Sequence, residues 1–360
     1  MDVMTENSCR IVVVTFAIAI VLTAATSARA QHGDYPLGTS GGIAAAQQPP
    51  SGIYYTNLWS YYRASGSDFV AIGPLKCGPL DRVCLSLNVG GNGSLDLFID
   101  QNIFWVVTPL TILGAHYGFL LDVPFAIADV SGAASIEPVL SRPLNSSLTK
   151  SFQTTGNGTK GSIGDIYLEP VDLGWHFPRL DVIASSAVVM PSGPYNANAK
   201  LNIGYGHWTG MFGLGGVAYA DRERTWSLSI YAHCELYGSQ MGRNYTLGYA
   251  VPFEWALGKS FTLTNDIVKQ LAIGAVGYAQ WQISGNSIDL TPTTKVATDA
   301  INTLESTRAQ FYSAGPAIQA LTKYGLFALR YYDEFGAHAT PSGQQLMFSY
   351  TLGGNPLGWR

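Results

Sequence analysis

Beyond residue 30 this chain combines few charges with no unbroken apolar segment that could cross a membrane as a helix. Only Ile103–Leu121 is uncharged over such a length, and Pro109, Gly114 and Gly118 interrupt it, which predicts two strands and a turn. Charged residues make up 12% of the chain, about half the usual fraction, and hydrophobic residues 47%. A soluble fold needs a charged surface, whereas a membrane barrel needs charge only in its loops and lumen.

The first thirty residues have the features of an export signal. Arg10 precedes an uncharged apolar run, Ile11–Ala28, and Ala28-Arg29-Ala30 has the small-x-small pattern of a signal peptidase site. We therefore predict a cleaved signal peptide at residues 1–30. The alternative is an uncleaved anchor helix, which the apolar run is barely long enough to form.

Residues 31–52 are rich in Gly, Ala and Pro and predict an extended leader, which could hang in the periplasm or fold into the lumen as a plug. Residues 53–360 are expected to form a single β-barrel domain. The pattern there predicts fourteen candidate strands: Ile53–Arg63, Leu95–Val107, Ala115–Ala128, Ile163–Trp175, Asp181–Met190, Lys200–Trp208, Met211–Tyr219, Trp226–His233, Tyr245–Trp255, Phe261–Val268, Ala272–Ile283, Gln310–Ala320, Leu326–Phe335 and Gln344–Leu352.

The predicted fold class is all-β, a transmembrane antiparallel β-barrel of the outer-membrane type with about 12–14 strands. In Trp226–His233, large apolar residues occupy every second position, and Ser, Tyr and His occupy the others. Pairing this strand with Tyr245–Trp255, with Ala232 opposite Tyr245, gathers the apolar residues on one face. A soluble β-sandwich would alternate in the same way, but its solvent face would carry Lys and Glu rather than Gly, Ser, Thr and Tyr.

The last two candidate strands can be paired by the same rule. Phe335 opposite Gln344 aligns their apolar residues and places Arg330 opposite Ser349. Ionisable residues on inward faces of such strands are candidates to line the lumen: Arg330, Glu334, Glu254, Glu235 and His233. They could form a constriction that tunes passage, or a salt-bridged filling that merely occupies the interior.

Catalytic and metal sites find little support in the sequence. His233 and Glu235 share a face about 7 Å apart, but Ser229 lies about 13 Å from His233, too far for direct activation. A serine from another strand could lie closer. No His has a partner at metal-ligand spacing, so we expect no metal, no catalytic residue and no cofactor. The net charge of −4, without a basic cluster, gives no reason to expect a nucleic-acid partner.

The cysteines are compatible with an oxidising compartment. Cys77 and Cys84 flank a turn-like segment and could close a small loop disulfide in the periplasm. Cys234 would remain as a packed thiol.

Several short motifs, in a shared order, are similar to those of one family. The chain resembles the phenol meta-pathway (MetA/SphA-like) outer-membrane proteins over nearly its whole mature length. The resemblance implies an outer-membrane barrel associated with breakdown of aromatic compounds, and supplies no catalytic or ligand-binding residues. The motifs are Pro49–Asn57, Gly164–Pro170, Leu173–His176, Pro191–Tyr195, Gly315-Pro316 and Arg330–Gly336.

We therefore expect a passive, porin-like transporter in the outer membrane of a Gram-negative bacterium. Its partners would be membrane lipid and a small hydrophobic or aromatic solute, and the oligomeric state stays open. The solute would diffuse through a lumen narrowed by Arg330, Glu254 and Glu334, with segment 31–52 as a gate. The alternatives are an outer-membrane hydrolase that uses His233, and a structural or adhesive surface protein that uses the long loop Ser287–Arg308.

Overall fold

The computed structural model describes residues 34–39, 42–43, 46–72, 84–141, 148–149, 152–197, 199, 201–289, 302, 305–306, 308–340 and 342–354. For 67–72, 84–92, 133–141, 148–149 and 152–156 it describes the backbone only. The expected signal peptide lies outside the described residues. Among the residues described, no helix has the length and apolar character needed to cross a membrane.

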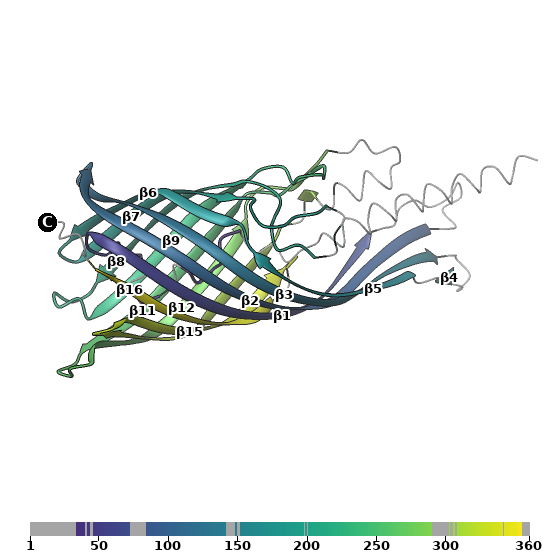
Figure 1. Ribbon diagram of the computed structural model, residues 1–360. Helices are drawn as coiled ribbons and strands as arrows, with labels where there is room; N and C mark the ends of the chain where they lie inside the picture. Colours follow the sequence, from purple (N-terminus) through teal and green to yellow (C-terminus); the bar gives the residue numbers. More distant parts are fainter. Residues whose placement is uncertain are drawn as a thin grey trace, which may run out of the picture.

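In the described part of the chain, twelve antiparallel strands close into a barrel (Figure 1). Each strand pairs with the next along the barrel, and β16 pairs with β1 to complete the ring. The strands are β1 (Gly52–Ile72), β2 (Cys84–Ile112), β3 (Ala115–Ser141), β6 (Ile166–Phe177), β7 (Leu180–Met190), β8 (Thr209–Tyr219), β9 (Trp226–Tyr237), β11 (Ala250–Thr262), β12 (Val268–Gln282), β14 (Gln310–Thr322), β15 (Gly325–His338) and β16 (Ser342–Gly354).

Four further strands lie outside this ring. β5 (Phe152–Ile163) pairs with β3 beyond the point where β6 leaves it, and β4 (Leu148–Thr149) pairs with the far end of β3. β10 (Tyr245–Thr246) pairs with β13 (Ser287–Ile288) in a separate small sheet. In Figure 1, β1, β2, β3 and β5 extend well past the barrel at one end.

The predicted fold class is confirmed, and two of the fourteen candidate strands are wrong. Residues 201–208 of the predicted Lys200–Trp208 strand form a loop, in which Asp165 Oδ2 accepts a hydrogen bond of 2.6 Å from Tyr205 N. The predicted Phe261–Val268 strand spans the turn between β11 and β12, where Asn265 Oδ1 accepts from Ile267 N at 2.8 Å. Such local polar contacts compete with strand pairing.

Both predicted registers are wrong by an even number of residues. Ala232 pairs with Phe253 rather than Tyr245, a shift of eight, and Phe327 pairs with Tyr350 rather than Leu352, a shift of two. An even shift keeps each side chain on its face, so the predicted inward and outward sides survive. Arg330 therefore still reaches Ser349, with 3.0 Å between Nη2 and Oγ.

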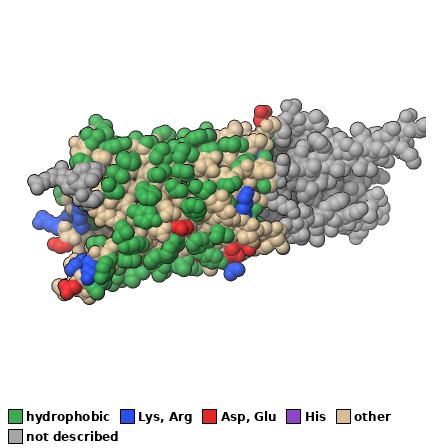
Figure 2. All heavy atoms as spheres, in the orientation of Figure 1, with side chains coloured by type: hydrophobic (Ala, Val, Ile, Leu, Met, Phe, Trp, Pro, Cys, Tyr) green, Lys and Arg blue, Asp and Glu red, His purple; other side chains and the backbone are tan. Residues whose placement is uncertain are grey.

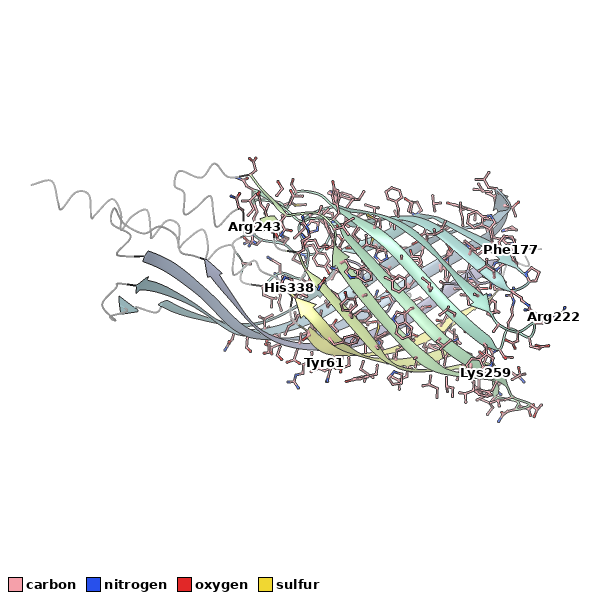
Figure 3. The ribbon with its side chains drawn as sticks, turned by 180° about the vertical axis from the view of Figure 1, so that it is seen from behind. Tyr61, Phe177, Arg222, Arg243, Lys259 and His338 are labelled. Carbon is pink, nitrogen blue, oxygen red and sulfur yellow. The ribbon has the colours of Figure 1, made fainter. Side chains whose placement is uncertain are left out.

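The two ends of the barrel differ. At one end the connections are two to six residues long, as between β2 and β3, where Leu113 and Gly114 both have positive φ, at 52° and 77°. This hairpin confirms the two strands and turn predicted for Ile103–Leu121. At the other end the connections are longer, apart from the three residues between β15 and β16 (Figure 3). Arg243 and His338 mark that end, and Arg222 and Phe177 the short-turn end.

The wall is apolar outside and largely polar inside. On β9, Trp226, Leu228 and Ile230 are exposed, while Ser229, Tyr231 and their inward neighbours are buried. Figure 2 shows apolar side chains covering the visible side of the barrel, with most charges towards its ends. This arrangement suits a barrel whose outer surface meets hydrocarbon.

Candidate functional site

Residues 34–39, 42–43 and 46–49, here called the inner segment, lie inside the barrel. Tyr35, Leu37, Ile43 and Ala46 are all buried, and each belongs to a cluster with side chains from the barrel wall. The backbone of the segment enters no strand, so its polar groups require partners from the wall. Three groups of contacts hold the segment, together with a hydrogen bond of 3.1 Å from Ala46 N to Ser229 Oγ.

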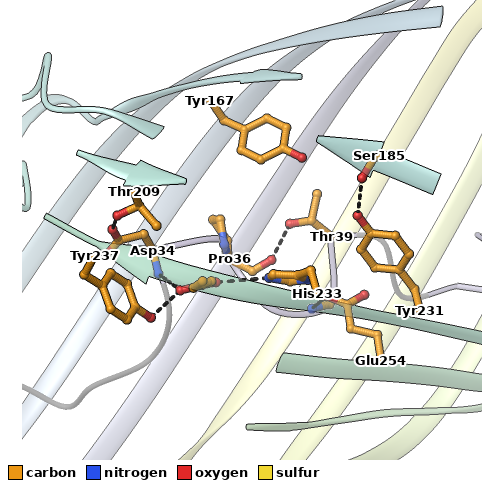
Figure 4. Close-up of polar contacts among 12 residues, drawn as sticks. Asp34, Pro36, Thr39, Tyr167, Ser185, Thr209, Tyr231, His233, Tyr237 and Glu254 are labelled. Atoms are coloured by element: carbon orange, nitrogen blue, oxygen red, sulfur yellow. Dashed lines mark hydrogen bonds and ion pairs between the residues drawn. The ribbon is translucent and has the colours of Figure 1, made fainter. Parts of the chain in front are cut away.

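The first group surrounds Asp34 (Figure 4). His207 Nε2 lies 2.9 Å from Asp34 Oδ2, and the Thr209 hydroxyl donates to the same oxygen. Asp34 N donates to Glu235 Oε2 at 3.0 Å. Glu235 also accepts from the Tyr237 hydroxyl and has His233 Nε2 at 3.0 Å from its other oxygen.

The second group holds Gly38. Gly38 N donates to Glu254 Oε1 at 2.9 Å, and Arg330 Nη1 donates to Gly38 O at 2.6 Å. The φ of Gly38 is +88°, and a Cβ there would lie 2.7 Å from Met347 Sδ and 3.0 Å from the Tyr332 ring. Both the backbone conformation and the space therefore require glycine.

The third group holds Gln48 near the short-turn end. Gln48 Nε2 donates to Asp172 Oδ2 at 3.1 Å, and Trp105 Nε1 donates to the same oxygen at 2.6 Å. A Cβ at Gly174 would lie 2.6 Å from Gln48 Cβ, and one at Gly258 would lie 2.3 Å from Ile43 Cγ2. The wall thus carries glycines where the inner segment approaches most closely.

All five residues predicted to line the lumen point into the barrel and are buried. Glu235, Glu254 and Arg330 bind the inner segment directly. His233 reaches it through Glu235 and by ring contact with Tyr35, with centroids 5.2 Å apart. Glu334 instead accepts from the hydroxyls of Tyr62 and Tyr278, at 2.8 and 2.9 Å, and so joins β15 to β1 and β12.

Asp34 and His207 lie outside the spanning strands, and both have shifted pKa values. Burial raises the pKa of Asp34, against the opposing effect of its bond to His207. Burial also favours the neutral imidazole of His207, but the hydrogen bond and the charge of Asp34 outweigh it and raise the pKa of His207. The charge of Asp165 also raises the pKa of His207.

The hydrolase interpretation gains no geometric support. His233 Nε2 is bonded to Glu235, and the Ser229 hydroxyl accepts from Ala46 N at 3.1 Å rather than facing the imidazole. Within the described residues no serine is hydrogen-bonded to His233, and no group of three or more His, Cys, Asp or Glu could hold a metal ion.

The remaining predicted features are only partly described. Cys77 lies outside the described residues and Cys84 begins β2 with its backbone alone described, so the proposed disulfide stays a prediction. Cys234 is a free thiol. Of the loop Ser287–Arg308, β13 pairs with β10, and Ile288 N donates to Glu305 Oε1 at 3.0 Å.

A closed antiparallel barrel with an apolar exterior and a polar interior defines an integral protein of the outer-membrane barrel class. Within that class, the chain belongs to the family whose model is described as "Putative MetA-pathway of phenol degradation", which matches residues 66–350. No curated protein shows a significant match.

Two solved structures illustrate the likeness. The COG4313 outer membrane channel from Pseudomonas putida F1 aligns with a TM-score of 0.49 and 15% identity, over 86% of this chain and 98% of that chain. A FadL homologue from Pseudomonas aeruginosa aligns with a TM-score of 0.35 and 11% identity, over 89% of this chain and 95% of that chain.

Proposed function

We propose that this protein is a passive outer-membrane channel for small hydrophobic or aromatic compounds, and that the inner segment is its gate. The observation that carries the proposal is that the inner segment is held inside the barrel by side-chain hydrogen bonds and apolar contacts, with no strand pairing to the wall. A segment without strand pairing can leave when those bonds break, whereas the wall cannot open as easily.

The wall behind the inner segment suggests the class of solute. Leu37 and Ile43 belong to a buried apolar cluster that includes side chains from β1, β11, β12, β14, β15 and β16: Leu58, Ala256, Ala272, Val276, Tyr278, Phe311, Ala317, Tyr332 and Met347. Departure of the inner segment would uncover this surface. An apolar wall with aromatic rings and a few polar groups suits an aromatic solute better than a sugar. The phenol-degradation description of the family agrees with that choice.

The polar groups that hold the inner segment would then define the narrow part of the passage. Glu254 and Arg330 face each other across Gly38, and Glu235 binds Asp34. In this proposal residues 1–30 act as a cleaved export signal, 31–52 include the gate, and 53–360 form the barrel. The protein purified from membranes should then begin at Gln31, as mass spectrometry would show.

A reversible lock tests the gate. Ala46 N lies 3.1 Å from Ser229 Oγ, so cysteines at both positions, Ala46→Cys with Ser229→Cys, should form a disulfide that ties the inner segment to β9. Vesicles with lipopolysaccharide in the outer leaflet should take up an apolar fluorescent naphthylamine faster with the unaltered protein than without it. The oxidised double variant should lose that increase, and reduction should restore it.

Either single cysteine variant, oxidised and reduced in the same way, controls for the reagents. Uptake by the locked protein equal to that of the unaltered protein would refute the gate while leaving a channel. Uptake by the unaltered protein no faster than by empty vesicles would refute the transport function itself.

A second test loosens the inner segment instead. Gly174→Ala places a methyl group within 2.6 Å of Gln48 Cβ, so the segment must shift away from β6. We expect uptake several-fold faster than with the unaltered protein. Gly210→Ala is the matched control, because a Cβ at Gly210 meets nothing within 4 Å. Equal uptake by the two variants would show that contact at Gln48 does not limit passage.

A further inference from the structure

The outward face of β1 and β2 carries polar side chains where the barrel should meet hydrocarbon. Asn57 on β1 lies opposite Asn102 on β2, and Asp100 follows two residues away on the same face of β2. Tyr55 OH donates to Asn102 Oδ1 at 2.7 Å, and Asn57 Nδ2 donates to Asp100 Oδ1 at 2.6 Å. We call Tyr55, Asn57, Asp100 and Asn102 the outer polar cluster. In Figure 2, an acidic side chain lies among apolar ones away from the ends of the barrel.

The register places the outer polar cluster within the apolar belt. Phe98 and Phe104, on the same face of β2, flank it and are 40% and 46% exposed. Trp59 of β1 and Phe125 of β3 lie opposite Asp100, and both are exposed. Surface charge resumes four residues further along β2, where Asp96 pairs with Arg63 at 3.1 Å. Four residues span roughly 13 Å of strand, or about 10 Å of depth at a tilt near 40°.

Part of the cluster's hydrogen-bonding capacity is unused. No hydrogen bond from a described residue reaches Asp100 Oδ2 or Asn57 Oδ1, and Asn102 Nδ2 has only a contact of 3.5 Å with Val123 O. In water such atoms would be solvated, but lipid chains offer them no donor or acceptor. Polar groups in a bilayer are therefore expected to face protein or a water-filled space, and this cluster faces outward.

The cluster is complementary to itself. Two copies in one membrane share an orientation, so a two-fold axis relating them runs along the membrane normal and keeps every residue at its depth. Asn57 and Asp100 are hydrogen-bonded neighbours on adjacent strands. An axis between β1 and β2 therefore brings Asn57 of one copy opposite Asp100 of the other, twice. The second N–H of the Asn57 amide makes a long contact of 3.3 Å with Gln101 O within its own chain, so it can donate instead to the unused Oδ2 of Asp100 in the other copy. Hydrogen bonds of this kind support association within membranes.

We propose that the outer polar cluster is the centre of a symmetric dimer interface formed by two copies of this chain. The surrounding rings of Trp59, Phe98, Phe104 and Phe125 form the apolar rim. The interface is independent of the transport function, because the side chains that hold the inner segment point the other way, into the barrel.

Disulfide trapping in native outer membranes tests the proposal. Asn102→Cys places a thiol in the cluster, whereas Leu228→Cys places one on the outward face of β9, on the far side of the barrel ring. Mild oxidation should convert Asn102→Cys to a dimer at least ten-fold more efficiently than Leu228→Cys. The unaltered chain, oxidised in parallel, controls for the native cysteines, and a heat-modifiable monomer band after reduction shows that each variant is folded.

Sedimentation equilibrium in detergent then tests whether the polar groups of the cluster stabilise the dimer, rather than merely lie near its interface. Asn57→Leu with Asp100→Leu should raise the dimer dissociation constant at least ten-fold, while Asp100→Asn, which keeps an acceptor, should remain within about three-fold of the unaltered chain. Equal trapping at both cysteine positions, or a dissociation constant unchanged by the double variant, would overturn the proposal. So would a monomer that retains lipopolysaccharide only when the outer polar cluster is intact, since the cluster would then bind lipid.

Discussion

Asp181, at the short-turn end of the barrel, shows how one buried carboxylate can join several strands. It accepts from Tyr219 OH on β8 and from Arg224 Nη1 in the following turn, both at 3.0 Å, and has His176 Nδ1 of β6 at 3.1 Å. The Arg224 guanidinium also donates to Phe177 O and lies over the Tyr219 ring, 4.6 Å from its centroid. Charge-assisted hydrogen bonds of this kind are stronger than hydrogen bonds between neutral groups.

We predict that Arg224→Ala destabilises the barrel by about 1–3 kcal/mol. The substitution leaves a fully buried carboxylate with fewer donors, which usually costs more, but a third of the Arg224 side chain is exposed, so water recovers part of the loss. The midpoint temperature at which the compact gel band is lost measures the effect. Arg222→Ala removes the same charge from an exposed position in the same turn and should change stability by no more than about 0.5 kcal/mol. Equal shifts in the two variants would contradict the prediction.

The sequence predicted some of the residues that hold the inner segment but missed those that no local pattern marks and whose partners lie far away along the chain. Strand parity was enough to place Glu254 and Arg330 inside the barrel, because facing follows from a period of two. Asp34 gave no such signal, since it lies in a Gly-rich leader and its partners His207 and Glu235 are 173 and 201 residues away. Likewise, parity places Asn57 on the face of Trp59 and Asp100 on that of Phe98, but only the register shows that Asn57 and Asp100 lie side by side.

At the scale of elements, the contact between Asp34 of the inner segment and His207 joins two groups that can gain or lose a proton. The pKa of Asp34 is raised above its ordinary 3.8, chiefly by burial, and that of His207 is raised above its ordinary 6.5, with Asp34 overcoming burial. Asp165 and Glu235 are the other acids whose charges act on this pair. Both shifts mean that the bound segment holds more protons than a released one, so its attachment weakens as pH rises.

We predict that raising the pH from about 6 to about 9 increases the open time of the channel in planar bilayers several-fold. The contribution of His207 is complete below pH 6.5 and is lost as pH passes through the raised pKa. His207→Gln keeps a donor for Asp34 but cannot titrate, so its open time should vary much less with pH. A shorter open time at high pH, or the same increase in the variant, would count against this role for the pair.

The strands show where reasoning from the sequence stops. Alternation located twelve strands and the correct faces, but it could not distinguish registers that differ by two or eight residues, because even shifts preserve every face. The true pairing of β9 with β11 depends on where the loop ends. Tyr245 and Thr246 pair with β13 in that loop, so β11 begins at Ala250. The pairing of β10 with β13 joins distant segments, so the alternation of residues within one strand cannot predict it.

For the molecule as a whole, the two unlike ends determine its orientation in the membrane. Outer-membrane barrels keep short turns on the periplasmic side and long loops outside. Here the turns after β2, β6 and β14 contain two residues each, whereas the connection between β7 and β8 spans residues 191–208. The extended ends of β1, β2, β3 and β5 lie on the long-loop side, and the C-terminal end of β16 lies on the short-turn side (Figure 1).

This asymmetry makes the orientation testable in cells. An epitope inserted after Met241, in the loop between β9 and β11, should bind antibody on intact cells, because that loop lies at the long-loop end, which we expect to face outward. The same epitope after Asp266, in the turn between β11 and β12, should bind only after the outer membrane is permeabilised. Both sites are exposed in the structure, so a difference reports the membrane barrier rather than burial. If only the Asp266 insertion were labelled on intact cells, the barrel would have the opposite orientation. Equal labelling of both insertions would show that the chain does not sit in a membrane.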